Sequence, residues 1–168
     1  MDGTPLKKED LLTLLEAARW APSSGNGQPW RFVYGLQGTP AFTGLFDLLA
    51  AGNRPWCSRA GALLVVLSKS TRDKGDRART HSFDTGAAWM SIALQATQMN
   101  LVAHGMEGFD YDRARSALSL SDEMTVECMV ALGHQGKSED LPEPYRSREQ
   151  PSTRRPIVEL VTELVPTK

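Results

Sequence analysis

One stretch near the start of the chain gathers side chains and backbone groups suited to holding a ligand. In seven positions it has two hydroxyls, two carboxamides and two glycines, namely Pro22, Ser23, Ser24, Gly25, Asn26, Gly27 and Gln28. Glycine and asparagine tolerate positive φ, so several backbone N–H groups can turn outward together. Such a cradle suits a flat polar ring or a phosphate. The alternative is a helix end followed by a plain polar loop, which composition alone favours. Residues 22–28 are called the polar loop below.

Three later segments also carry groups that bind ligands. The glycine-bounded turn from Gly105 to Gly108 can present backbone N–H groups. Asn53 offers both a donor and an acceptor on one side chain. Arg154 and Arg155 form an adjacent pair of guanidinium groups that suits bidentate contact with a phosphate. Each has a structural alternative, respectively a simple connection, a turn-forming asparagine and a solvated arginine pair.

Several kinds of reactive site are not indicated. His81, His104 and His134 do not have the spacing of metal ligands, so no metal site is predicted. Cys57 and Cys128 lack metal or redox spacing and are interpreted as buried thiols. Because neither a nucleophile motif nor a phosphate loop with a lysine is found, no catalytic side chain is predicted.

Composition sets the class of the protein. The chain has 168 residues, of which 40% are hydrophobic and 23% charged, and this indicates one globular domain over 1–168. The formal net charge of −1 gives no bulk attraction to nucleic acid or to a membrane surface. The polar N-terminal segment does not resemble a signal peptide, and no apolar run has the length of a membrane span. We therefore expect a cytoplasmic protein with no nucleic-acid or membrane partner.

Hydrophobic periodicity places these groups between helices and strands. Helices are expected at Lys7–Trp20, from Pro40 to Gly52 with Thr39 as N-cap, at Phe83–Leu101, and from Asp110 as N-cap to Leu118. Strands are expected at Trp30–Tyr34, Ala62–Leu67, Val102–Gly105 and Thr125–Leu132. The nearly continuous apolar run Ala62–Leu67 indicates a strand buried on both faces. Residues 53–56 are expected to form a turn, and residues 69–79 a charged, solvated loop.

Two segments indicate self-association. The Phe83–Leu101 helix is apolar over most of its circumference, so it belongs either to the core or to a subunit interface. From residue 137 onward, prolines favour an extended C-terminal arm (137–168). Within it, Ile157, Val158, Leu160 and Val161 have the composition of a strand that pairs with a neighbouring subunit's sheet. A homodimer with exchanged arms is predicted.

The segment Arg-Trp-Ala-Pro-Ser-Ser-Gly-Asn-Gly-Gln-Pro-Trp-Arg-Phe, from Arg19 to Phe32, resembles the signature of the FMN-dependent nitroreductase family. The resemblance extends from about Leu11 to Pro156. It implies an α+β fold, a three-layer α/β/α sandwich with a central, mostly antiparallel sheet. It also implies a helical dimer interface and an exchanged C-terminal arm.

The same resemblance implies a cofactor, a site and an activity. The cofactor is FMN, NAD(P)H is the co-substrate, and the electrons pass to a small acceptor such as a nitroaromatic, a quinone or an activated alkene. A backbone N–H near Glu107 would face flavin N5, Asn53 would bond the ring edge, and Arg154 would hold the phosphate with Arg155 beside it. The implied FMN-binding residues are Pro22, Ser23, Ser24, Asn26, Gln28, Asn53, Met106, Glu107, Gly108, Arg154 and Arg155.

Two departures from the family pattern lead to an alternative. Family members usually carry an Arg-Arg-x-x-Arg segment before the first helix, whereas the segment here is Met1-Asp2-Gly3-Thr4-Pro5-Leu6. Trp56 stands where some members have a lysine, so a ring there could line the substrate pocket and change the preference among substrates. Because the basic segment is missing, we expect weak FMN binding. The alternative function is a non-catalytic flavin-binding module, or a cofactor-poor relic of the fold, and the flavin absorption band of the purified protein separates these possibilities.

Overall fold

The computed structural model describes residues 1–164 and divides the chain into two units, Met1–Lys137 and Ser138–Lys168. The first unit contains the four-stranded sheet, and the described part of the second, residues 138–164, consists of short helical segments and extended chain. The prediction of one domain over 1–168 stays a prediction, and the two units are described separately.

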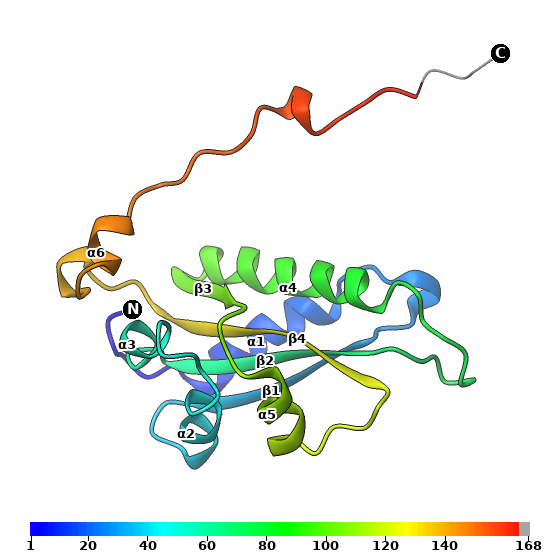
Figure 1. The fold of residues 1–168 in the computed structure, drawn as a ribbon, viewed down its shortest axis with the longest axis horizontal. Coiled ribbons are helices and arrows are strands. Elements are labelled where there is room, and N and C mark those ends of the chain that lie inside the picture. The colour runs from blue at the N-terminus through cyan, green and yellow to red at the C-terminus, as the bar shows by residue number, and fades with distance from the viewer. Residues whose placement is uncertain (165–168) are drawn as a thin grey trace. The chain divides into compact units, whose positions relative to one another are not determined.

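The first unit is built on four antiparallel strands in the order β1-β2-β4-β3 (Figure 1). The strands are β1 (Trp30–Leu36), β2 (Ala62–Lys69), β3 (Leu101–Met106) and β4 (Met124–His134). All four were predicted, although each extends beyond its predicted bounds. The sheet is antiparallel throughout, whereas the family resemblance implied a mostly antiparallel one.

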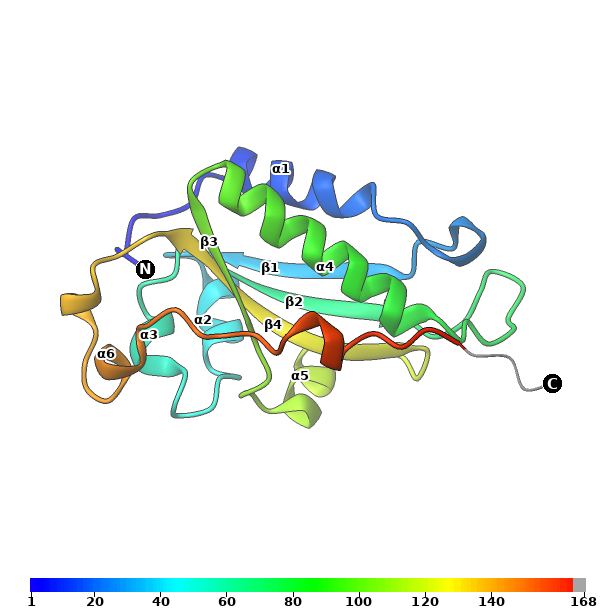
Figure 2. The ribbon, with the colours of Figure 1, turned by 90° about the horizontal axis from the view of Figure 1, so that it is seen from above.

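Helices cover both faces of this sheet. On one face lie α1 (Lys8–Arg19) and α4 (His81–Gln98), side by side in Figure 2. On the other lie α2 (Pro40–Phe46), α3 (Arg54–Cys57) and α5 (Tyr111–Ala117). Alternate residues of β2 enter the two cores: Leu64 and Val66 pack with α1 and α4, whereas Leu63 and Val65 pack on the opposite face. This confirms the predicted burial on both faces and the three-layer α/β/α arrangement.

A β-bulge interrupts the pairing of β2 with β4. Val66 pairs with Cys128 but Leu67 pairs with Val126, so Glu127 is an extra residue in β4. Beyond the bulge the alternation of side chains changes phase. Val126 therefore packs on the face of the sheet that α2, α3 and α5 cover. Val130, also at an even position in the same strand, packs on the other face with α1 and α4.

Local signals explain where the smaller helices begin. The Thr39 side chain accepts a hydrogen bond from the Phe42 backbone N–H, and Asp110 accepts one from Arg113, as both predicted N-caps require. Two boundaries were wrong. The helix expected to reach Gly52 ends at Phe46, and residues 54–57 form α3 rather than a turn. Pro55 lies in the first turn of α3, where a proline removes no helical hydrogen bond.

The long helix α4 has one buried face and one exposed apolar face. Ala88, Ile92 and Ala96 are fully buried against the sheet and α1. Phe83, Met90 and Leu94 are exposed, with 82% of the Phe83 surface accessible. The helix thus contributes to the core and also leaves an apolar surface without a partner within the described residues of its own unit.

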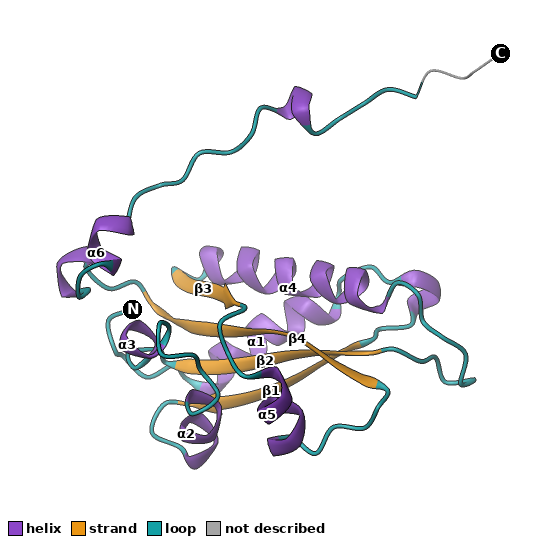
Figure 3. Ribbon diagram, in the orientation of Figure 1, coloured by secondary structure: helices purple, strands orange, loops and turns teal. Residues whose placement is uncertain are grey.

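The second unit contains η2 (Ser138–Asp140), α6 (Tyr145–Arg148) and η3 (Ile157–Glu159). In the single chain Ile157–Glu159 form a 3-10 turn and residues 138–164 contain no strand (Figure 3), so the predicted pairing of this segment with a neighbouring subunit's sheet stays a prediction. Exposed apolar side chains remain, namely Ile157, Val158, Leu160, Val161 and Leu164. Exchange of this arm between subunits stays a prediction.

Candidate functional site

The polar loop has the backbone conformation that its sequence predicts. Gly25, Asn26 and Gln28 have φ values of 57°, 56° and 44°. Within the loop, the Gln28 backbone N–H donates to Ser23 Oγ at 3.1 Å, and Gln28 Nε2 donates to the Asn26 carbonyl at 3.1 Å. Ser24, Asn26 and Gln28 are exposed to solvent. The loop is therefore internally bonded and presents polar groups outward.

A carboxylate from α4 fixes the start of this loop. The Ser24 backbone N–H donates to Asp84 Oδ2 at 3.1 Å, and Thr80 Oγ1 donates to the same oxygen at 2.9 Å. Asp84 is only 7% exposed. Asp84 was not among the residues predicted from the sequence. Its signal was an acidic residue in the first turn of an otherwise apolar helix, which suits the helix dipole but has no obvious surface role.

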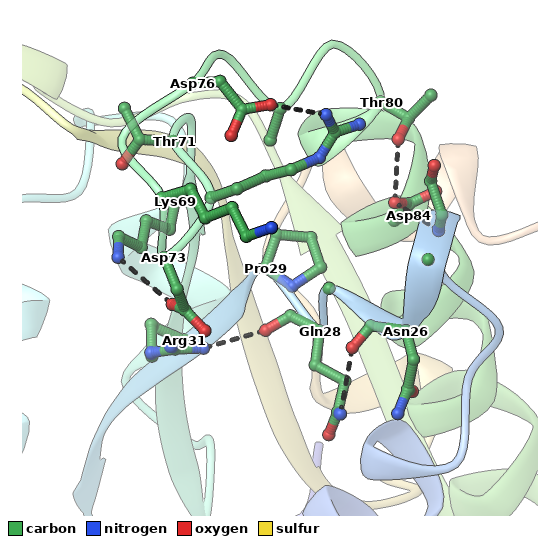
Figure 4. A pocket seen from close by; sticks show the side chains of 16 residues that line it. Asn26, Gln28, Pro29, Arg31, Lys69, Thr71, Asp73, Asp76, Thr80 and Asp84 are labelled. Atoms are coloured by element: carbon green, nitrogen blue, oxygen red, sulfur yellow. Dashed lines mark hydrogen bonds and ion pairs between the residues drawn. The ribbon is translucent and has the colours of Figure 1, made fainter.

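The polar loop forms one side of a cavity of about 730 Å³. Figure 4 shows Asn26 and Gln28 on one side and Lys69 and Asp73 on the other, with Pro29 between them. The second side belongs to the charged loop (residues 69–79), which is held by hydrogen bonds of its own, including Arg72 N–H to Asp76 O at 2.8 Å. The lining residues are Ser24, Gly25, Asn26, Gly27, Gln28, Pro29, Arg31, Lys69, Thr71, Arg72, Asp73, Lys74, Asp76, Ala78, Thr80 and Asp84.

The cations around this cavity differ in their partners. Arg72 forms an ion pair with Asp76 at 2.7 Å, and Lys69 lies 3.8 Å from Asp73. The Arg31 guanidinium donates to the carbonyls of Gln28 and Trp30, at 3.0 and 2.6 Å. Its positive charge therefore meets backbone dipoles rather than a carboxylate.

A second group of predicted residues meets beside α3. Asn53 Nδ2 donates to the Gly108 carbonyl at 2.9 Å, and the Ala50 N–H donates to the same carbonyl at 3.0 Å. A Cβ on Gly108 would lie 2.7 Å from Asn53 Nδ2. The structure thus brings Asn53 and Gly108 into direct contact and explains why a glycine fits at position 108.

The neighbours of this contact divide into buried and accessible groups. The Met106 side chain is buried, and the Cys57 thiol lies 3.4 Å from its sulfur. Burial raises the pKa of Cys57 to about 12. Glu107 is exposed. The Trp56 ring lies 4.7 Å from the His104 ring, centroid to centroid, so an aromatic surface borders the turn after β3.

A third polar cluster escaped the sequence analysis. The fully buried Ser68 donates to Glu127 and lies 2.7 Å from His81 Nδ1, and Ser82 donates to Glu127 at 2.7 Å. Glu127 is the residue of the β4 bulge, so only the paired strands reveal that its side chain can reach Ser68. This cluster ties β2 and β4 to the start of α4.

The predicted site residues do not all meet within the described structure. Ser24, Asn26 and Gln28 line the cavity, and Pro22 and Ser23 precede them in the polar loop without lining it, whereas α3 with Asn53 lies toward the other end of the sheet (Figure 2). Arg154 and Arg155 belong to the second unit, where Arg154 Nη1 donates to Ser152 Oγ at 2.7 Å. Among residues 1–164 no group of three His, Cys, Asp or Glu side chains is arranged to hold a metal ion. Over the same residues, every helix is too short or too polar to cross a membrane.

Comparison with known proteins gives the same family as the signature. The family model described as the nitroreductase family matches residues 1–35 and 36–134. A crystal structure described as an oxidoreductase containing FMN is 42% identical, with a TM-score of 0.92 over 96% of this chain and 84% of that one. A nitroreductase family protein from Clostridium difficile 630 is 26% identical, with a TM-score of 0.71 over 96% of this chain and 88% of that one.

A further relative comes from the comparison of sequences. An uncharacterized 15.4 kDa protein in the ask 5′ region of Mycolicibacterium smegmatis is 34% identical over an alignment of 114 positions, which covers 63% of this chain and 76% of that one. The family model alone matches well over half of the chain. The protein belongs to the nitroreductase family.

Proposed function

We propose that this protein is an FMN-dependent oxidoreductase that takes reducing equivalents from NAD(P)H. It passes them to a nitroaromatic, a quinone or an activated alkene. The observation that carries the proposal is the cavity of about 730 Å³ bordered by the polar loop, because the family signature and a volume suited to a small molecule coincide there. The related oxidoreductase that contains FMN supports the choice of cofactor.

The residues present fit a flavin. Ser24, Asn26 and Gln28 are exposed polar groups at the cavity, and a loop with successive positive φ values presents backbone donors to a ring or a phosphate. Pro22 and Ser23 are proposed to contact the cofactor at the polar loop. Because α3 lies toward the other end of the sheet, Asn53, Met106, Glu107 and Gly108 are proposed to contact the FMN held by the polar loop of a second copy of the chain, with Asn53 bonding the ring edge. Arg154 and Arg155 are proposed to bind the FMN phosphate.

The chain's own groups act by binding and positioning. Bound FMN supplies the two-electron chemistry, so no side chain has to act as nucleophile or general acid. Hydrogen bonds from the polar loop fix the ring, and the contact between Asn53 and Gly108 fixes the turn after β3. The Trp56 ring, tilted against the His104 ring, offers an aromatic face for an aromatic acceptor.

We also propose a cytoplasmic homodimer. The exposed Phe83, Met90 and Leu94 on α4 form an apolar stripe at helical spacing, which suits a second copy of the same helix. The apolar residues near the end of the second unit suit the exchanged arm predicted from the sequence.

The test has two stages. The first is the visible spectrum of the purified protein, before and after FMN is added and the excess removed. The second is anaerobic consumption of NADH or NADPH with a quinone or a nitroaromatic. A retained flavin band with acceptor-dependent turnover supports the proposal. A bound flavin without turnover with any donor identifies a binding module instead, and no flavin after reconstitution identifies a cofactor-poor relic.

A further inference from the structure

The charged loop (residues 69–79) gives the cavity a cationic side that the proposed flavin contacts do not use. Four cationic side chains line the cavity, Arg31, Lys69, Arg72 and Lys74, together with the carboxylates of Asp73, Asp76 and Asp84. Asp84 is already bonded to the Ser24 N–H and to Thr80. The Asp84 carboxylate is therefore neutralised in part by these two donors, on the side of the cavity that the polar loop forms.

Two of these cations lack a carboxylate partner. Arg31 donates only to backbone carbonyls. For the Lys74 ammonium group no hydrogen bond or ion pair is formed within residues 1–164. Lys69 and Arg72 are paired, but only with carboxylates of the same loop, and the Asp73 side chain is fully exposed. An exposed ion pair contributes little to stability, so an incoming anion can displace one of these carboxylates at small cost.

The position of the cationic side selects the kind of anion. The polar loop, proposed to hold the flavin ring, lies on one side of the cavity, and the charged loop with Lys69 lies on the other. Arg31 bonds the Gln28 carbonyl and so borders the polar loop itself. A ligand that fills the space therefore places a neutral, flat end near the polar loop and an anionic end near the charged loop, which carries Lys74. A reducing dinucleotide has this polarity, with its nicotinamide at one end and its phosphates toward the other.

We propose that Arg31 and the charged loop bind the phosphate groups of the reducing dinucleotide and favour the 2′-phosphorylated form, NADPH, over NADH. The inference rests on the proposed function and adds the choice of donor to it. An extra phosphate brings up to two further negative charges and three acceptor oxygens. Arginine and lysine are the side chains that bind such groups through charge-assisted hydrogen bonds.

A redox-inactive probe tests the inference without turnover. Binding of adenosine 2′,5′-bisphosphate and of adenosine 5′-monophosphate is measured by titration calorimetry on the purified full chain. The wild type should bind the bisphosphate at least about tenfold more tightly. Lys74→Gln and Arg31→Gln should each weaken it by about ten- to a hundredfold, the range for loss of one charge-assisted contact. Arg31→Lys, which keeps the charge, should lie between Arg31→Gln and the wild type.

The matched control is Lys8→Gln, because Lys8 is exposed on α1 and does not line the cavity. It should bind the bisphosphate like the wild type. Thermal unfolding of all variants excludes a general loss of structure. In steady-state assays, Lys74→Gln should raise the KM for NADPH about tenfold or more and change the KM for NADH much less.

Other outcomes separate failure of the inference from failure of the proposed function. Equal binding of the two adenosine phosphates by the wild type would overturn the inference. Turnover by the same protein with 1-benzyl-1,4-dihydronicotinamide, a donor without phosphate, would leave the proposed function intact. If the charge-removing variants instead lose FMN relative to riboflavin while binding of the bisphosphate is unchanged, the cations serve the flavin phosphate and the inference is wrong.

Discussion

The carbonyl oxygen of Gly108 accepts hydrogen bonds from both the Asn53 side chain and the Ala50 backbone. In Gly108→Ala the new Cβ would lie 2.7 Å from Asn53 Nδ2, so the carboxamide has to move and loses its bond. We expect FMN affinity to fall by up to about tenfold, since one neutral hydrogen bond contributes roughly 0.5–1.5 kcal/mol. Fluorescence titration with FMN measures the change.

Gly44→Ala is the control for this substitution. Gly44 lies in α2, and a Cβ there meets nothing within 4 Å. Alanine should therefore leave FMN affinity unchanged and stabilise the helix by about 0.5–1 kcal/mol. If Gly108→Ala bound FMN as tightly as the wild type, the contact between Asn53 and Gly108 would not contribute to FMN binding.

The two thiols predict a loss of stability in alkali. Cys57 is buried as the sequence predicted, whereas Cys128 is only half-buried. Burial raises the pKa of Cys57 from 9.0 to about 12, and burial also raises the pKa of Cys128, to about 11. Above pH 9 the unfolded chain releases a thiol proton that the folded chain retains, so the free energy of unfolding falls as pH rises. For Cys57 the slope approaches about 1.4 kcal/mol per pH unit until its folded pKa is reached. Urea unfolding between pH 8 and 10.5 measures this slope.

Cys57→Ala measures how much of this pH-dependent loss of stability is due to the Cys57 thiol. The variant should be less stable at pH 8, because a buried side chain is shortened. Its free energy of unfolding should nevertheless fall less steeply above pH 9. If the free energy of unfolding of the variant fell with pH as steeply as that of the wild type, Cys57 would not be the cause of the loss of stability above pH 9.

Among the elements, α4 does more than cover the sheet, because Asp84 connects its first turn to the polar loop. In Asp84→Ala the Ser24 N–H and the Thr80 hydroxyl lose their common acceptor. We expect a loss of about 1–3 kcal/mol in the free energy of unfolding, together with weaker FMN binding. Urea unfolding and FMN titration on the same sample measure both quantities.

Asp84→Asn keeps an acceptor oxygen, so its free energy of unfolding and its FMN affinity should both fall less than those of Asp84→Ala. Thr80→Val removes only one of the two donors to Asp84, so it should affect stability more than FMN affinity. If Asp84→Ala bound FMN as tightly as the wild type, the orientation of the polar loop would not depend on α4.

The elements that the sequence predicted correctly are those whose cause is local. Thr39 followed by Pro40, and Asp110 before an amphipathic segment, determine where α2 and α5 begin through contacts within one turn. Continuous apolar character was enough to identify β2 as a doubly covered strand. The polar loop was recognised from its sequence motif, and its glycine and asparagine residues indicated positive φ.

What the sequence did not reveal depends on contacts between distant segments. Asp84 lies 60 residues from Ser24, and Glu127 lies 59 residues from Ser68. The cavity also depends on long-range structure, since residues 69–79 appeared only as a charged, solvated loop until the sheet placed them opposite the polar loop. In residues 54–57 the propensity of Asn53 and Pro55 for turns concealed a single helical turn.

At the scale of the whole molecule, the exposed apolar face of α4 predicts a dimer in solution. Light scattering at micromolar concentration should give about twice the mass of 18.5 kDa. Met90→Asp combined with Leu94→Asp should produce a folded monomer, because each carboxylate would have to be desolvated at the interface.

Leu12→Asp is a matched control for this pair of changes, since Leu12 is an exposed leucine on α1, 47% accessible. It should leave the dimer intact. A wild-type chain that scatters as a monomer would contradict the prediction, as would a double variant that remains dimeric.

The bulge at Glu127 affects how changes in chain length can accumulate in this fold. Insertions and deletions are ordinarily tolerated in surface loops, because in a strand they turn every later side chain to the other face. Here the extra residue is already present, and its carboxylate serves the buried Ser68. Loss of the single codon for Glu127 would restore regular pairing and leave Val126 opposite Leu67, on the same face of the sheet as now, but it would remove the acceptor of the Ser68 hydroxyl. Homologues with β4 one residue shorter should therefore also carry a nonpolar residue in place of Ser68, the two changes being inherited together.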